Sequence, residues 1–179
     1  MNQVEVRLDD GSLGEMTRIG QLTRSASRTG DTVRFDYSEE WLDGTGVAAS
    51  FALDHELLLA NGAHYAHAGA DQLSGIFLDC SPDRWGKMLM DRREAIEARA
   101  GNRPMRPLRG WDYLIGVNDE SRMGALRLYD ANANTYVDSR HLSAPPITEL
   151  RALEEAAWML EQGKDEDVDR WLKQLIAPG

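Results

Sequence analysis

The residue types that can perform chemistry are few and scattered in this sequence. Gly86 and Lys87 form the pair found near the end of a phosphate-binding loop, but such a loop also needs a glycine five positions earlier and Ser or Thr after the lysine. Those places hold Ser81 and Met88. The Gly-Thr-Gly stretch of residues 44–46 is not followed by an expected helix. Neither pattern therefore predicts a nucleotide site.

A metal site is the second candidate. His64, His67 and Asp71 are spaced as i, i+3 and i+7, so a helix would place them on one face. Imidazole and carboxylate groups so arranged can bind a divalent metal. The segment is rich in alanine and glycine, however, and a stable helix is not expected. Ordinary histidines in an exposed loop are the favoured interpretation, and we assign no metal ligands.

The single cysteine, Cys80, excludes an intramolecular disulfide. It precedes an expected helix N-terminus, where a thiolate would be stabilised, but no pattern supplies a partner base. A small buried hydrophobic residue is the favoured interpretation. No spacing specifies a Ser-His-Asp triad either. We expect no catalytic residue and no bound cofactor in this chain.

Composition narrows the functional classes further. The 179 residues suffice for one domain or two small ones, and their net charge is −10. A surface of that sign repels phosphate backbones, so direct DNA binding is not expected and basic partners are favoured. No apolar run is long enough to span a bilayer, and the N-terminus does not resemble a signal peptide. We expect a soluble, cytoplasmic protein without a membrane partner.

The first part of the chain is predicted to be rich in β-strands. Alternating apolar residues predict strands over residues 4–8 and 32–37, and two further strands are expected over 12–19 and 47–53. Asp10-Gly11 is the signal for a hairpin turn between the first two strands. Ser38 is expected to cap a single helical turn. Residues 55–80 show no clear period and are predicted to be a loop with at most a turn of helix.

Helices dominate the second part. Ser81 is expected to be the N-cap of a helix that ends at Gly101, with Trp85 on its apolar stripe as a core anchor whose truncation lowers the melting temperature sharply. A short helix over 111–117 and a strand over 121–130 follow. Apolar spacings of three and four predict two closing helices over 147–163 and 165–176.

Three stretches in this order resemble the N-terminal region of HipA-family serine/threonine kinases: VRFDYSEEWL (33–42), SPDRWGKMLMDRR (81–93) and WDYLIGVNDESRMGALRL (111–128). The resemblance implies an α+β fold that is part of the N-lobe of a HipA-like kinase. It divides the chain into a β-rich subdomain over 1–80 and a mainly helical part over 81–179. The motif positions that we expect to be structural are Trp85, Gly86, Asp112, Gly116, Met123, Gly124 and Arg127. Gly86 would let its helix approach a strand closely, with Trp85 beside it.

The family resemblance also implies a function for a longer protein. HipA-like kinases are ATP- and Mg-dependent toxins of type II toxin–antitoxin pairs, act on the translation machinery, and are restrained by a HipB-like helix-turn-helix antitoxin that binds DNA. Their phosphate-binding lysine and catalytic aspartates have no matching positions here. We therefore expect this chain to be a non-catalytic fragment that ends, at Gly179, near the ATP loop, and that reaches DNA only through the antitoxin.

Two alternatives remain open. The chain can be a stand-alone regulatory module, because some HipA-related systems encode the N-terminal subdomain as a separate protein that restrains a shorter kinase. It can also be an unrelated α+β binding domain.

Overall fold

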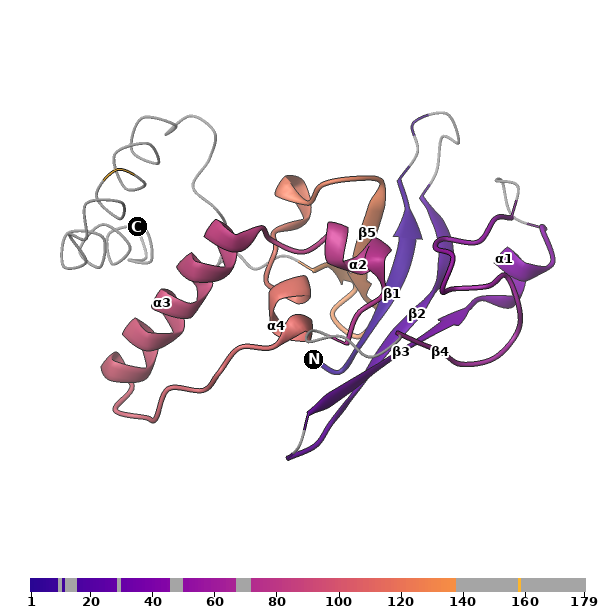
Figure 1. The fold of residues 1–179 in the computed structure, drawn as a ribbon. Coiled ribbons are helices and arrows are strands. Elements are labelled where there is room, and N and C mark those ends of the chain that lie inside the picture. The colour runs from indigo at the N-terminus through magenta and orange to yellow at the C-terminus, as the bar shows by residue number, and fades with distance from the viewer. Residues whose placement is uncertain are drawn as a thin grey trace.

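The computed structural model describes residues 1–9, 11, 16–28, 30–45, 50–66, 72–137 and 158. These residues form a six-stranded sheet in the order β4-β3-β2-β1-β5-β6, in which all neighbouring strands are antiparallel (Figure 1). The strands are β1 (Gln3–Leu8), β2 (Thr17–Ala26), β3 (Asp31–Tyr37), β4 (His64–Tyr65), β5 (Leu126–Asp130) and β6 (Thr135–Tyr136). With five helices beside this sheet, the predicted α+β class is confirmed.

The two strands with clear alternation form where the sequence predicts them. In β3, Val33, Phe35 and Tyr37 point to one face and are buried. Of the predicted return strand, residues 17–19 lie in β2 and residues 12–15 lie outside the described residues. Leu8 pairs with Thr17, so eight residues separate the paired positions. The Asp10-Gly11 signal was therefore wrong as a sign of a tight hairpin. The prediction of a strand over 47–53 is also wrong at residues 50–53, the part that the structure describes, because these residues are not in a strand.

The helices are α1 (Glu39–Leu42), α2 (Gly75–Asp79), α3 (Arg84–Ala100), α4 (Gly110–Ile115) and the 3-10 helix η1 (Asp119–Ser121). The Ser38 hydroxyl caps α1 by accepting a hydrogen bond from the Trp41 backbone N–H, as predicted. β4 and α2 lie in the stretch that shows no sequence period, and each is too short to display one.

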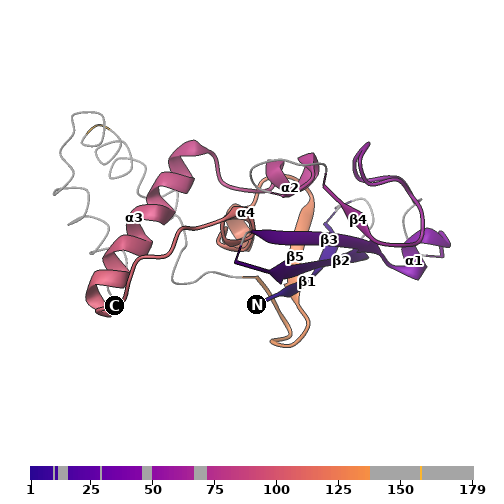
Figure 2. The same cartoon turned by 60° about the horizontal axis from the view of Figure 1, so that its bottom comes forward.

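The hydrophobic core lies between one face of the sheet and the helices α2 and α4, which cover that face together (Figure 2). The Phe35 ring on β3 and the Phe77 ring on α2 have centroids 5.5 Å apart. Trp41 and Trp111 are each 1% exposed, and the Trp111 indole donates a hydrogen bond to the Met1 carbonyl. Burial of Phe77 on α2 and of Trp111 on α4 is the main force that holds these two helices on the sheet.

Helix α3 differs from this arrangement. It begins at Arg84, and its N-cap is Asp83 rather than the predicted Ser81; the Asp83 carboxylate accepts a hydrogen bond from the Gly86 N–H at 2.8 Å. Figure 1 shows α3 to the side of the sheet rather than on its face. Trp85 is only half-buried and lies outside the core cluster, so its predicted role as a core anchor was wrong.

The sheet joins both predicted parts of the chain. β5, from the second part, pairs with β1, from the first, although the division at residue 80 itself stays a prediction. The closing helices expected over 147–163 and 165–176, and Gly179, lie outside the described residues apart from Trp158. Within the described ranges, no helix has the length and apolar character needed to cross a membrane.

Candidate functional site

Polar side chains gather where α4 and the preceding segment, residues 101–109, meet the ends of β2 and β3. Asp112 on α4 is 8% exposed and accepts hydrogen bonds from the Arg109 backbone N–H and the Arg106 guanidinium, both at 3.1 Å. Arg24 of β2 lies 3.6 Å from the same carboxylate. This motif residue therefore caps its own helix and ties the helix to its neighbours.

A second buried carboxylate continues the network into the sheet. Asp31 of β3 is 7% exposed and forms ion pairs with Arg24 at 2.9 Å and with Arg109 at 2.7 Å. Arg109 thus binds β3 with its side chain and α4 with its backbone. The result fixes the N-terminus of α4 against the sheet.

A third carboxylate connects α3 to the same segment. Both terminal guanidinium nitrogens of Arg103 donate to Glu94, at 2.5 and 2.9 Å, and the Arg106 backbone N–H donates to it at 3.0 Å. The Arg103 guanidinium beside it lowers the pKa of Glu94 to about 2. Glu94 is therefore ionised at neutral pH and holds α3 on the segment.

The three arginines of this segment form a feature that sequence analysis missed. They occur in the repeat Arg103-Pro-Met-Arg106-Pro-Leu-Arg109, and we call them the arginine ridge. Their side chains are 41, 55 and 38% exposed, whereas their partner carboxylates are 6–8% exposed. The three-residue spacing of these arginines was the available signal in the sequence.

Two motif glycines permit close packing. A Cβ at Gly116, directly after α4, would meet the Met90 side chain of α3 and lie 2.8 Å from the Asp112 carbonyl. A Cβ at Gly86 would lie 2.8 Å from the Pro82 ring. Gly86 therefore allows a tight entry into its own helix, and the expected approach to a strand was wrong.

The remaining motif residues are Arg127 in β5 and Met123 and Gly124 in the turn before it. Arg127 forms an ion pair with Asp9 at 3.3 Å and donates to the carbonyls of Arg122 and Gly124. Gly124 has φ +80°, a conformation that favours glycine. Met123 is 78% exposed, although it was expected among the apolar positions of a strand. The strand starts only at Leu126.

Arg122 is a buried charge that sequence analysis also missed. It is 4% exposed and donates to the carbonyls of Cys80, Leu114 and Val117 at 2.9–3.1 Å. Burial lowers the pKa of Arg122 and raises that of the Cys80 thiol. Arg122 thus joins the C-terminal ends of α2 and α4, and Cys80 is a buried residue, as predicted.

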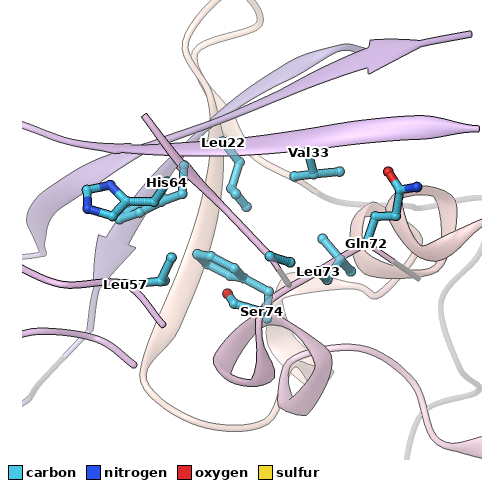
Figure 3. Close-up of a pocket in the computed structure, with 10 residues that line it drawn as sticks. Leu22, Val33, Leu57, His64, Gln72, Leu73 and Ser74 are labelled. Carbon is cyan, nitrogen blue, oxygen red and sulfur yellow. The ribbon is translucent and has the colours of Figure 1, made fainter. Parts of the chain in front are cut away.

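A small hollow lies between β3, β4 and α2 (Figure 3). The buried His64 Nδ1 and Ser74 Oγ have no hydrogen-bond partner, and both residues line the hollow. Its enclosed part has room for about one water molecule. That space is far below the several hundred Å³ typical of a small-molecule site.

The candidate reactive residues do not converge. Among the described residues, no three His, Cys, Asp or Glu side chains are grouped to hold a metal; His67 and Asp71 lie outside that part. Lys87 lies over the Tyr113 ring at 5.2 Å. The motif side chains instead position α3, α4 and β5 relative to the sheet.

A family model described as the HipA N-terminal domain matches residues 12–129, about two thirds of the chain. The chain belongs to the HipA N-terminal domain family. The family inferred from the three motifs is thereby confirmed. In this HipA N-terminal domain, β1 precedes the matched residues yet pairs with both β2 and β5 inside them. No curated protein and no solved structure matches the chain.

Proposed function

We propose that this HipA N-terminal domain is a non-catalytic region of a HipA-like serine/threonine kinase, where it serves as structural support and as a contact surface for partners. ATP and Mg²⁺ would bind elsewhere in such a kinase, to lysine and aspartate residues that have no matching positions in this chain. The proposed setting is a type II toxin–antitoxin pair. A HipB-like antitoxin is the proposed protein partner, and the translation machinery is the proposed source of the kinase substrate.

The observation that carries this proposal is the set of contacts that the motif residues make. Asp112 and Arg127 bind backbone groups and charged neighbours, and Gly116 admits the Met90 side chain. Catalytic groups instead converge on a space that accepts a substrate. Residues that fix the junction between helices and sheet support a role in shaping a lobe and presenting its surface.

The first experiment tests the absence of catalysis. We expect the purified chain, incubated with radiolabelled ATP and Mg²⁺, to show neither ATP hydrolysis nor phosphate transfer above a buffer blank. A HipA-like kinase in the same assay is the positive control. Metal-dependent phosphorylation by the chain alone would contradict the proposal.

The second experiment tests the partner. The net charge of −10 favours a basic partner and opposes a phosphate backbone. In a gel mobility-shift assay at about 150 mM salt, an ionic strength at which exposed charges are partly screened, we expect the chain alone to leave the mobility of duplex DNA unchanged. When a HipB-like antitoxin is already bound to the DNA, we expect the chain to lower the mobility of that complex further. Salt-sensitive binding of duplex DNA by the chain alone would overturn this part.

A stand-alone regulatory module is the second candidate function. It is favoured by the core, which is assembled from residues between Val4 and Val137 and needs no second chain to be buried. A kinase assay separates the two candidates. Under the second candidate, adding the chain to a shorter HipA-like kinase inhibits phosphorylation in proportion to the complex formed; under the first, it does not inhibit.

A further inference from the structure

One long stretch of the chain combines negative charge with exposed apolar side chains. Residues 35–83 contain nine aspartates and glutamates and neither lysine nor arginine, although the whole chain has 20 of these basic residues. Among the described residues, five of the ten exposed large hydrophobic side chains also lie in this stretch: Phe51, Leu58, Leu59, Tyr65 and Leu78. Exposed apolar groups that gather among polar ones are typical of a surface that contacts a partner.

One loop of this stretch is held in place by two buried aromatic side chains. The Phe51 ring packs against the Trp41 ring with centroids 5.1 Å apart, and the Phe51 carbonyl accepts a hydrogen bond from the Trp41 indole at 3.1 Å. The Tyr37 hydroxyl accepts from the Leu53 backbone N–H at 2.9 Å and donates to the Leu57 carbonyl at 2.8 Å. Because the loop is already ordered, a partner that binds it does not have to fix its conformation.

The same contacts keep three apolar side chains of this loop outside the core. Leu57 occupies the core position, with 1% exposure, so that Leu58 and Leu59 directly after it remain 66 and 40% exposed. Phe51 is 47% exposed. One hydroxyl, that of Tyr37, binds the loop both before and after its turn, so the two arms lie close together. We call Phe51, Leu58 and Leu59 the apolar patch.

The charges nearest to the apolar patch in the chain are negative. Glu39, Glu40 and Asp43 are exposed on α1 and directly after it, the helix that carries the Trp41 ring. Asp54 and Glu56 lie in the turn of the loop itself. Figures 1 and 2 both show α1 and this loop at the same end of the sheet. Their field favours a cationic partner.

We propose that the apolar patch binds a basic amphipathic helix of a partner protein. Such a helix presents leucine-type side chains on one face and lysine or arginine beside it, so it covers the apolar patch and places cations next to the α1 carboxylates. A nucleic acid or a second copy of this chain would bring like charge to the same surface. The inference gives the proposed contact role a place and rests on that role, not on the kinase setting.

The test uses a model ligand and the full chain. The probe is a fluorescein-labelled peptide of about 14 leucines and lysines whose leucines share one helical face. A scrambled peptide of the same composition, without such a face, carries the same charge. Binding is followed by anisotropy at about 50 mM salt, where surface charges are weakly screened.

Two pairs of substitutions separate the apolar patch from other exposed apolar groups. Leu58→Ser with Leu59→Ser removes most of the apolar patch. Met105→Ser with Met123→Ser is the control, because these side chains are 60 and 78% exposed and lie outside residues 35–83. Thermal unfolding by circular dichroism checks that both variants fold.

We expect the parent to bind the amphipathic peptide about tenfold more tightly than the scrambled one, because only the former presents an apolar face. The leucine pair should weaken this binding about tenfold and the methionine pair less than about twofold. Glu40→Gln should weaken it about twofold at this salt concentration, whereas Glu120→Gln, on an exposed residue outside the stretch, should not.

Three results would overturn the proposal. Equal affinities for the two peptides would show that charge alone attracts them. Equal losses in the two paired variants, or no binding by the parent, would show that the apolar patch is not the site. A parent dimer that Leu58→Ser with Leu59→Ser converts to a monomer in sedimentation velocity would assign the apolar patch to a second copy of the chain. If the antitoxin binds the chain while the peptide does not, only this surface is wrong and the proposed function stands.

Discussion

The sheet with its covering helices and helix α3 are held in place by different forces. The sheet, α2 and α4 share an apolar cluster that includes Trp111, which is 1% exposed. Among the described residues, helix α3 is joined to its neighbours by polar contacts, such as Glu94 with Arg103 and the Tyr113 hydroxyl with Asp91 at 2.7 Å, and by the Met90 side chain, which packs at Gly116. The position of α3 therefore depends on charge, whereas the stability of the sheet depends on the burial of apolar side chains.

Substitutions of Trp111 in the core and Trp85 in α3 should show the largest difference in stability between the two regions. Trp111→Ala is expected to lower the free energy of unfolding by about 3–5 kcal/mol, because it empties a fully packed core position. Trp85→Ala is expected to cost at most about 2 kcal/mol, since that ring is half-buried and outside the core. Urea unfolding of both variants measures the difference. Equal losses would place α3 and the sheet in one core.

Arg122 tests whether a buried charge is as important to the sheet region as its apolar contacts. Arg122→Met is expected to lower the free energy of unfolding by about 3 kcal/mol, because the Cys80, Leu114 and Val117 carbonyls lose their donor. Arg18→Met is the matched control on a side chain that is 42% exposed, and it should cost under about 1 kcal/mol. A neutral effect at Arg122 would show that apolar packing alone joins α2 to α4.

Gly116 lies where the two regions touch. Gly116→Ala is expected to cost about 1–3 kcal/mol, because the new methyl group overlaps the Met90 side chain and approaches the Asp112 carbonyl. Gly11→Ala is the control, since a Cβ there meets nothing within 4 Å. Thermal unfolding compares the two. If Gly116→Ala is as well tolerated as the control, α3 can move away from α4 at little cost.

The attachment of α3 should depend on pH. The pKa of Glu94 is lowered from its ordinary value of 4.5 to about 2, so its ion pair contributes stability above pH 4.5 that is lost as the pH falls toward 2. At pH 7 the contribution is expected to be about 1–2 kcal/mol, reduced by the solvent exposure of Arg103. The free energies of unfolding of the parent and of Glu94→Gln, measured as the pH is lowered from 7 toward 2, should become more alike. A constant difference would show that the charge is not what matters.

The same contrast explains what the sequence could predict. Alternating Val33, Phe35 and Tyr37 identified β3, because a half-buried strand shows its period directly. The motifs identified the family, and the residue pattern over 111–117 predicted the short helix α4. The apolar stripe of α3 suggested a core helix, but its burial depends on which neighbours pack against it. Local sequence does not contain that information.

The polar network was invisible for a related reason. Asp31 lies 78 residues from Arg109 and meets the arginine ridge only after the sheet has formed. Glu94 and Asp112 are nearer in sequence, nine residues from Arg103 and six from Arg106, but no periodic pattern marks these pairs. Arg122 likewise binds carbonyls that tertiary structure brings together. The Arg-Pro repeat could have been noticed, yet its partners could not be assigned from spacing alone.

Hydrogen exchange of the Glu94→Gln variant tests the central claim most directly, namely that α3 is attached by charge and separately from the core. At neutral pH, amides of α3 and of residues 103–109 should exchange about tenfold faster than in the parent, which corresponds to about 1.4 kcal/mol. Amides of β1, β2 and β3 should keep their parent rates. Equal acceleration in α3 and in these strands, or no acceleration in α3, would contradict the account.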